Sequence, residues 1–164
     1  MMHRRAAAIC GLLMILICAA PPARAVAEPT PEARPKFAHG TVMVKGKDGT
    51  PRNLRVEVAR SEQEVAHGLM FESDLPGTDG MLFMMPKLEL QRFWMKNTLI
   101  PLDIVFLDAE GRVVDVADHV QPLSTTHVVS MTPAQMVLEV KAGMAAQWGI
   151  EPGATVTPPP TLSE

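Results

Sequence analysis

Residues 101–117 read PLDIVFLDAEGRVVDVA and describe two strands joined by a tight loop. The first strand, Leu102–Leu107, is apolar on both faces except at Asp103, so we expect it inside a sheet. Pro101 lacks an amide donor and marks the start of that strand. The Asp-Ala-Glu-Gly loop that follows predicts a hairpin into a partner strand, Arg112–Ala117.

The rest of the chain carries further short strand patterns and two helix signals. One helix is expected to begin at the capping box Ser61–Glu64 and to end at Gly68, and the other to cover Ala142–Trp148. The predicted fold is α+β but mostly β, a curled antiparallel or mixed sheet or small barrel of about seven or eight short strands with two short helices. The remaining strands are expected at Thr41–Lys45, Leu54–Val58, Gly80–Met85 (ended by Pro86), Arg92–Asn97, Met136–Lys141 and Thr155–Thr157.

The N-terminus has the three parts of a secretory signal peptide. Two arginines precede an apolar run over Ala6–Ala20, and Ala-Arg-Ala follows at 23–25. We expect cleavage near Ala25 and export to the periplasm or the extracellular space. Because a helical span needs about 20 apolar residues, no stable membrane span is expected after cleavage. A proline-rich linker at 26–36, one domain at 37–157 and a flexible tail at 158–164 complete the predicted organisation.

The composition excludes several function classes. Both cysteines, Cys10 and Cys18, lie within the predicted signal, so the mature chain has no thiol nucleophile and no cysteine ligand for a metal. Without residues 1–25 the formal charge falls from −3 to −6 because three arginines are lost. Since phosphate neutralisation dominates nucleic-acid affinity, an acidic domain without a basic run is not expected to bind nucleic acid.

The stretch Phe93–Asp103 holds the densest set of polar and aromatic side chains. If it begins as a strand, Arg92, Trp94 and Lys96 point to one side. One hypothesis is a pocket in which Lys96 or Arg92 meets a small anionic or polar ligand, Trp94 stacks on it and Asp103 fixes the cation. The alternative is structural: Asp103 caps the turn before Pro101, and Trp94 fills the core.

Glu139 is a second candidate, because it interrupts the apolar strand pattern around it. Its side chain either projects to solvent or joins Lys96 in one cleft. In the second case Glu139 and Asp103 form a carboxylate pair that suits acid–base hydrolysis.

No metal or cofactor is expected. Met81, Met84 and Met85 form a cluster of soft ligands suited to Cu(I), although methionine also fills cores. The histidines are scattered, without the close spacing of a zinc site. Motifs of serine hydrolases and of nucleoside-triphosphate enzymes are missing from the sequence.

The chain carries, in this order, the segments His67–Phe71, Gly80–Phe83, Phe93–Ile104, Val137–Glu139 and Gly143 before a short helix. Together these segments resemble the DUF192 (UPF0127) family over about residues 52–157. The resemblance implies a small, mostly β, single domain that is often exported and has no established function. Two positions depart from the pattern: His67 stands where arginine is usual, and Ala154 where aspartate is usual. The implied motif positions are Gly68, Leu69, Met70, Trp94, Met95, Lys96, Asn97, Thr98, Pro101, Asp103 and Glu139.

The leading hypothesis is therefore an exported ligand-binding or accessory module. The first alternative is a hydrolase that uses Asp103 and Glu139, followed by a structural or assembly partner and then by Cu(I) handling through methionine. The predicted ligand-binding residues are Trp94, Lys96, Asn97, Asp103, Glu139 and Met70.

Overall fold

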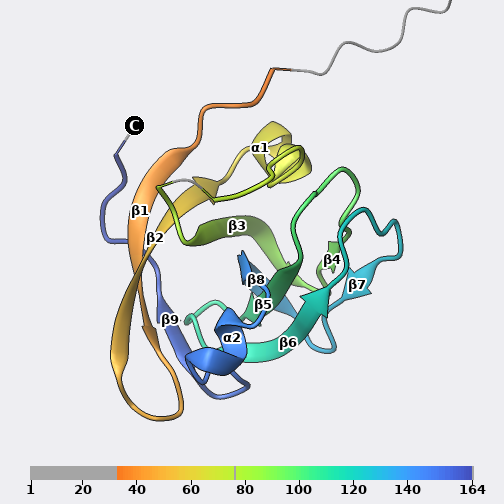
Figure 1. Ribbon diagram of the computed structural model, residues 1–164. Coiled ribbons are helices and arrows are strands. Elements are labelled where there is room, and N and C mark those ends of the chain that lie inside the picture. The colour runs from red at the N-terminus through yellow and green to blue at the C-terminus, as the bar shows by residue number, and fades with distance from the viewer. Residues whose placement is uncertain (1–32, 76, 164) are drawn as a thin grey trace, which may run out of the picture. The chain divides into compact units, whose positions relative to one another are not determined.

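The computed structural model describes residues 33–75 and 77–163, and these residues belong to one compact unit. The predicted signal peptide and most of the predicted linker lie outside the described residues. The described part contains nine strands and two short helices (Figure 1). They are β1 (Ala38–Lys45), β2 (Pro51–Ala59), α1 (Glu62–His67), β3 (Gly80–Glu89), β4 (Arg92–Phe93), β5 (Leu102–Leu107), β6 (Val113–Val120), β7 (Val128–Val129), β8 (Ala134–Lys141), α2 (Met144–Gln147) and β9 (Thr155–Thr157).

Seven of these strands form one curled sheet, a half-barrel, in the order β6-β5-β8-β3-β2-β1-β9. Its neighbouring strands are antiparallel except β2 and β3, which run parallel. The two remaining strands, β4 and β7, pair as a small second sheet beside it (Figure 1). The predicted mostly β fold with a curled mixed sheet and two short helices is confirmed.

The strand predicted to be internal is β5, and every one of its residues is buried. It lies between β6 and β8, and β6 follows it through the predicted hairpin loop. Its apolar residues fill both faces of the sheet, which explains why the pattern does not alternate.

The two faces of the sheet carry separate apolar clusters, which we name after the helices beside them. The α1 face contains Met81 and Ile104, together with Leu69 next to α1. The α2 face contains Val140 and, from α2, Ala145. Figure 1 shows α1 and α2 on opposite sides of the strands.

Helix α1 begins as the capping box predicts. The Ser61 hydroxyl accepts a hydrogen bond from the amide of Glu64, and the Glu64 carboxylate accepts one from the amide of Ser61. The helix ends at Gly68, where φ is +50°. Helix α2 is shorter than predicted and begins only after Gly143, because the φ of +88° at that residue is incompatible with a right-handed helix.

Two strand boundaries differ from the prediction. Strand β3 continues past Pro86 to Glu89, because its register with β8 shifts between Met84 and Glu89 and Pro86 falls in that irregular segment. Strand β4 contains only Arg92 and Phe93, since the chain then turns through Asn97 at a φ of +60°.

Both predicted loose segments make defined contacts. The Arg34 guanidinium donates two hydrogen bonds to the Glu57 carboxylate, at 3.0 and 2.6 Å, and pairs with Glu72 at 2.6 Å. Near the other end, Ser163 exchanges two backbone hydrogen bonds with His39.

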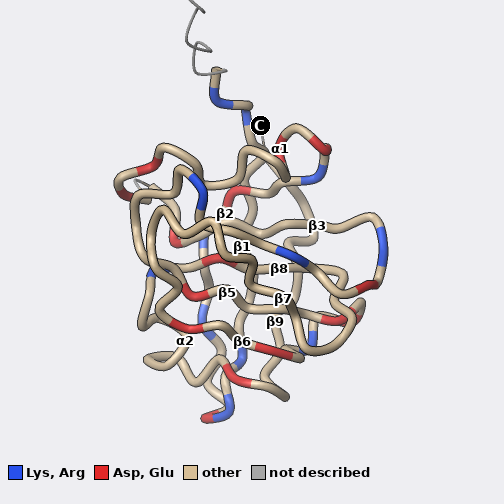
Figure 2. The backbone as a smooth tube through the Cα atoms, turned by 90° about the vertical axis from the view of Figure 1, so that its right-hand side faces the viewer, with Lys and Arg blue, Asp and Glu red and all other residues tan. Residues whose placement is uncertain are grey.

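Basic and acidic residues are interspersed along the chain (Figure 2). None of the helices in the described part is long and apolar enough to span a membrane.

Candidate functional site

A small hollow opens on the α1 face, between the end of α1 and the loop that follows β4. It offers about 30 Å³ to molecules the size of water. A cavity needs roughly 10–15 Å³ on this kind of measure to hold one water molecule, so the hollow admits one or two such groups. Its lining residues are Val65, Ala66, His67, Gly68, Leu69, Met70, Phe83, Phe93, Trp94, Thr98 and Glu139.

Glu139 reaches this hollow because of its register in the sheet. It pairs with Met81 of β3 and with Ile104 of β5, and directly opposed residues share a face. The residue is only 4% exposed, and its side chain makes no hydrogen bond or ion pair with the described residues. Burial raises the pKa of Glu139 to about 8, so the carboxyl is mostly protonated at neutral pH.

Thr98 is a second polar group with the same character. It is 5% exposed, and its hydroxyl has no hydrogen-bond partner among the described residues. Its backbone amide donates to the carbonyl of Met95 at 3.1 Å, which fixes the turn that brings the hydroxyl to the hollow. In the described part of the chain, no fully enclosed polar side-chain atom lacks a partner. The carboxyl of Glu139 and the hydroxyl of Thr98 therefore reach solvent, and the hollow is the opening that both line.

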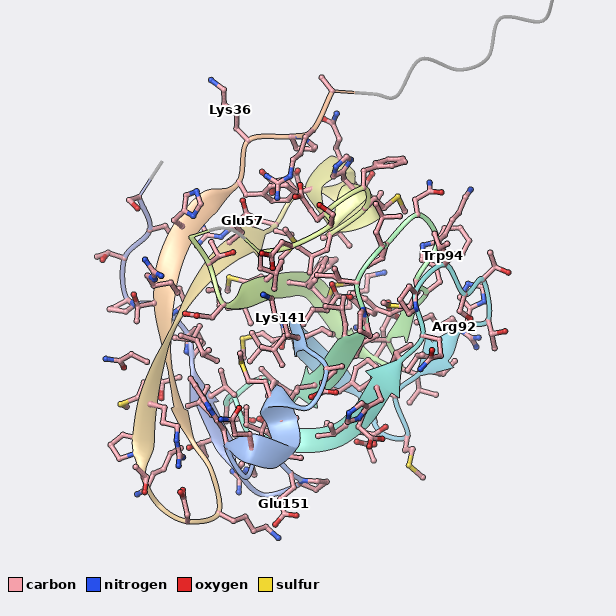
Figure 3. The ribbon with its side chains drawn as sticks, in the orientation of Figure 1. Lys36, Glu57, Arg92, Trp94, Lys141 and Glu151 are labelled. Atoms are coloured by element: carbon pink, nitrogen blue, oxygen red, sulfur yellow. The ribbon has the colours of Figure 1, made fainter. Side chains whose placement is uncertain are left out.

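Trp94 forms part of the wall and is 40% exposed. Its ring stacks on His127 with centroids 5.5 Å apart and an angle of 15° between the planes. The Nζ atom of Lys96 lies 5.2 Å from the centroid of the same ring. Lys96 is thus placed by the indole, at the outer edge of the site. Arg92 is exposed and does not line the hollow, although Figure 3 places it on the same flank as Trp94.

Met70 and Asn97 are held together beside the hollow. The Asn97 side-chain amide contacts the Met70 sulfur at 3.8 Å, and the Asn97 carbonyl accepts a hydrogen bond from the amide of Phe71 at 2.7 Å. Met70 lines the hollow, whereas Asn97 is not among its lining residues. Asn97 therefore acts as a positioning residue for the thioether.

Asp103 lies elsewhere, and the predicted ion pair with Lys96 or Arg92 is wrong. The fully buried carboxylate accepts hydrogen bonds from the backbone amides of His119 and Ala145, each at 2.9 Å. Since Ala145 is the second residue of α2, Asp103 caps that helix from a distance, and it does not cap the turn before Pro101.

The cause is the alternation of side chains along a strand. Ile104 pairs with Glu139, whereas Asp103 pairs with Val140. Asp103 consequently faces α2 and Glu139 faces α1. The two carboxyl groups lie on opposite faces of the sheet and cannot share a cleft, which removes the geometric basis of the predicted hydrolytic pair.

Sequence reasoning missed the strained rim of the site. Phe71, Asn97 and Leu123 all have left-handed backbones, with φ of +67°, +60° and +61°. Backbone hydrogen bonds join their loops, because the Phe71 amide donates to Asn97 and the Leu123 amide donates to Thr98. Such a conformation costs about 1–3 kcal/mol per residue and concentrates at functional sites. A non-glycine residue gives no sequence signal for it.

The predicted methionine cluster is not assembled. Met81 is fully buried in the α1 face, while Met84 and Met85 line a different hollow of about 200 Å³ together with Met136. The described residues contain no group of three or more His, Asp or Glu side chains that could hold a metal ion.

Comparison with models of known protein families shows which family the chain belongs to. The model of the DUF192 family, described as "Uncharacterized ACR", matches residues 43–158. The chain belongs to this family. The Glu139 hollow, with Met70, Trp94 and Thr98 in its wall, lies within the matched DUF192 region.

Two solved structures are similar to this DUF192 chain. One is described as a putative transcription regulator from Sinorhizobium meliloti 1021, with 30% identity, a TM-score of 0.71, and coverage of 74% of this chain and 94% of its own. The other is a protein of unknown function from Novosphingobium aromaticivorans DSM 12444, with 36% identity, a TM-score of 0.70, and coverage of 85% and 93%. No curated protein matches the chain.

Proposed function

We propose that this DUF192 protein is a binding module that takes a small polar group of a ligand into the Glu139 hollow. One observation carries the proposal: Glu139 and Thr98 are both more than nine-tenths buried, both lack a partner among the described residues, and both line the same hollow. Buried polar groups in native proteins nearly always have a hydrogen-bond partner, and for these two groups the partner must be a molecule that enters the hollow. A ligand that hydrogen-bonds to both groups supplies that partner.

The predicted binding residues divide into three roles under this proposal. Glu139 and Thr98 bind the polar group, and Trp94 and Met70 form the wall around it. Lys96 lies over Trp94 at the outer edge, where it can meet a second, anionic part of a larger ligand. The other two predicted residues do not contact the ligand under this proposal: Asn97 positions Met70, and Asp103 stabilises α2.

Binding is favoured over catalysis because no other carboxyl group lines the hollow among the described residues. General acid–base hydrolysis by a carboxylate pair needs one carboxyl group on each side of the bond that is cleaved. Strained loops at the rim and an acid with a raised pKa are compatible with both functions. The lack of a second carboxyl among the described lining residues argues against hydrolysis by a carboxylate pair and supports the binding proposal.

We also propose that the protein acts outside the cytoplasm. The support is the signal-like sequence of residues 1–25, with its basic start, apolar run and Ala-Arg-Ala end.

A ligand screen by thermal shift tests the binding proposal. The wild-type protein and the variants Glu139→Gln and Thr98→Val are screened against small amines, alcohols, carboxylic acids and sugars. A compound bound to the folded state raises the melting temperature, and we expect the rise to shrink in both variants.

The matched control is Glu151→Gln, the same chemical change at an exposed carboxylate that pairs with Lys47 at 3.1 Å. Figure 3 shows Glu151 at the end of the molecule away from Trp94. The control should respond to ligands as the wild type does. If no compound class separates the wild type from the hollow variants, this site does not bind ligands.

A further inference from the structure

We propose that the group which enters the hollow is a primary ammonium at the end of an apolar chain. This inference rests on the proposed binding function and adds the chemical class of the ligand.

Size is the first argument. The hollow offers about 30 Å³ to water-sized molecules. An ammonium group has nearly the dimensions of a water molecule, so it fits within that space. A sugar ring or a guanidinium is several times larger and would have to stay outside. The hollow is therefore shaped for the tip of a ligand.

The second argument is hydrogen bonding. A primary ammonium has three donors and no acceptor. The ionised Glu139 carboxyl offers two acceptor oxygens, and the Thr98 hydroxyl offers a third acceptor that no described residue uses. A carboxylate ligand would instead face Glu139 with a second set of acceptors. The hydrogen-bond acceptors of the hollow therefore match a cationic donor better than an anion.

The surrounding wall gives the third argument, because its side chains are electron-rich. Phe83, Phe93 and Trp94 line the hollow with aromatic rings, and Met70 adds a polarisable sulfur. Aromatic faces attract ammonium groups within about 6 Å. The molecule already shows this contact, since the Lys96 ammonium lies 5.2 Å from the Trp94 centroid.

The charged groups around Glu139 leave its carboxyl available. From α1, the ring of His67 lines the hollow and lies between two phenylalanine rings, at 6.4 and 6.2 Å. The facing residues from β3 and β5 are the uncharged Met81 and Ile104. On β8 itself Lys141 pairs with Asp74 at 2.5 Å. Lys96 contributes one cation at the rim, held by Trp94 rather than by the carboxyl.

The rim accounts for the apolar chain of the ligand. Phe71, Leu99 and Leu123 are 53, 47 and 60% exposed, and they lie on the loops that hydrogen-bond around Asn97 and Thr98. Exposed apolar residues gathered at one place indicate a contact surface. An alkyl chain that leaves the hollow would cover them, which is why we infer an alkylammonium rather than free ammonium.

Binding of a cation must release a proton from Glu139. With a pKa of about 8, roughly nine in ten carboxyls are protonated at pH 7. The ammonium binds the carboxylate, so the carboxyl proton leaves to solvent and close to one proton is released per ligand. The apparent affinity should rise up to about tenfold per pH unit from pH 6 to pH 8 and level off above that.

The experiment is an NMR titration of the full chain with butylammonium, 1-butanol and butyrate at constant ionic strength. These probes have the same chain length and differ in charge. The indole NH of Trp94 reports on the hollow, and that of Trp148, beside α2, is an internal control. Probes this small bind weakly, with dissociation constants of roughly millimolar order. We expect butylammonium to shift the Trp94 signal at least tenfold more strongly than either other probe at pH 8.

The variants make the assignment specific. Glu139→Gln should abolish both the preference for butylammonium and the pH dependence, Thr98→Val should weaken binding, and Glu151→Gln should change neither. Nα-acetyl-lysine N-methylamide, used as a further probe, distinguishes a free amine from a lysine side chain of a peptide as the source of the ammonium. If 1-butanol or butyrate shifts Trp94 as strongly as butylammonium does, the ammonium inference fails and the binding function stands. If no probe shifts Trp94 and the thermal-shift screen is also blank, both fail.

Discussion

The replacement Glu139→Gln should stabilise the protein at neutral pH, although it removes a group from the proposed site. In the folded protein burial raises the pKa of Glu139 to about 8, from an ordinary value of 4.5. The folded state therefore holds a proton on this carboxyl at pH 7, while the unfolded state has released it. Because one pKa unit corresponds to about 1.4 kcal/mol, the mismatch lowers the free energy of unfolding by roughly 3 kcal/mol at pH 7.

The direction of the pH dependence follows from the proton count. Between about pH 4.5 and pH 8 the folded state binds more protons at Glu139 than the unfolded state, so stability falls as the pH rises. Below this window both states are protonated and the contribution vanishes. Above it both are ionised and the loss stays constant. A glutamine cannot ionise, so the variant lacks this fall.

Urea unfolding followed by far-ultraviolet circular dichroism between pH 5 and pH 8 measures the effect. Wild type and Glu139→Gln should differ by less than about 1 kcal/mol at pH 5, because that pH lies only half a unit above the unfolded-state pKa of 4.5. The variant should be more stable by roughly 2–3 kcal/mol at pH 7. All other ionisable groups are common to both proteins, so their contributions cancel in the difference. Parallel stability curves would show that Glu139 is ionised in the folded state and would refute the reasoning.

Two further predictions concern Asp103 and the N-terminus. Asp103→Ala should destabilise the protein by roughly 3 kcal/mol or more in urea unfolding, because it leaves the amides of His119 and Ala145 without their charged acceptor. The variant should bind ligands at the hollow as the wild type does. If a fully folded Asp103→Ala protein lost binding, a purely structural role of Asp103 would be contradicted. Mass spectrometry of protein secreted from an expression host should find a new N-terminus at Val26, and an intact Met1 in the exported fraction would rule out cleavage.

Local chemistry made most of the fold predictable. The capping box of Ser61 and Glu64, the hairpin after Leu107 and the buried run of β5 each depend on neighbouring residues alone, and each occurs as expected. The errors fall where distant pairing decides. Strand β7 has only two residues and exists because it pairs with β4, and β3 tolerates Pro86 because its partner shifts register there.

Three of the residues predicted to bind a ligand line the hollow, but their arrangement could not be predicted from the sequence. Trp94, Met70 and Glu139 line one hollow, although they come from three separate segments. The sequence places Asp103 near Trp94 along the chain, which suggests a shared site. Its real position depends on the pairing of β5 with β8, which no local pattern reveals. The left-handed backbone at Phe71 was equally hidden.

The contrast between the two buried carboxyl groups is the reason to assign function to one of them. Asp103 has both oxygens bonded to backbone amides, so its burial is explained by the fold itself. Glu139 is buried to nearly the same extent, its side chain gains no bond from the described residues, and its raised pKa predicts a loss of stability at neutral pH. A domain is typically stable by only about 5–15 kcal/mol, so a loss of roughly 3 kcal/mol is a large fraction. An apolar residue at 139 would avoid that loss and would still fill the α1 face. What an apolar residue cannot do is accept a hydrogen bond from a group that enters the hollow, and that ability is what Glu139 adds to the molecule.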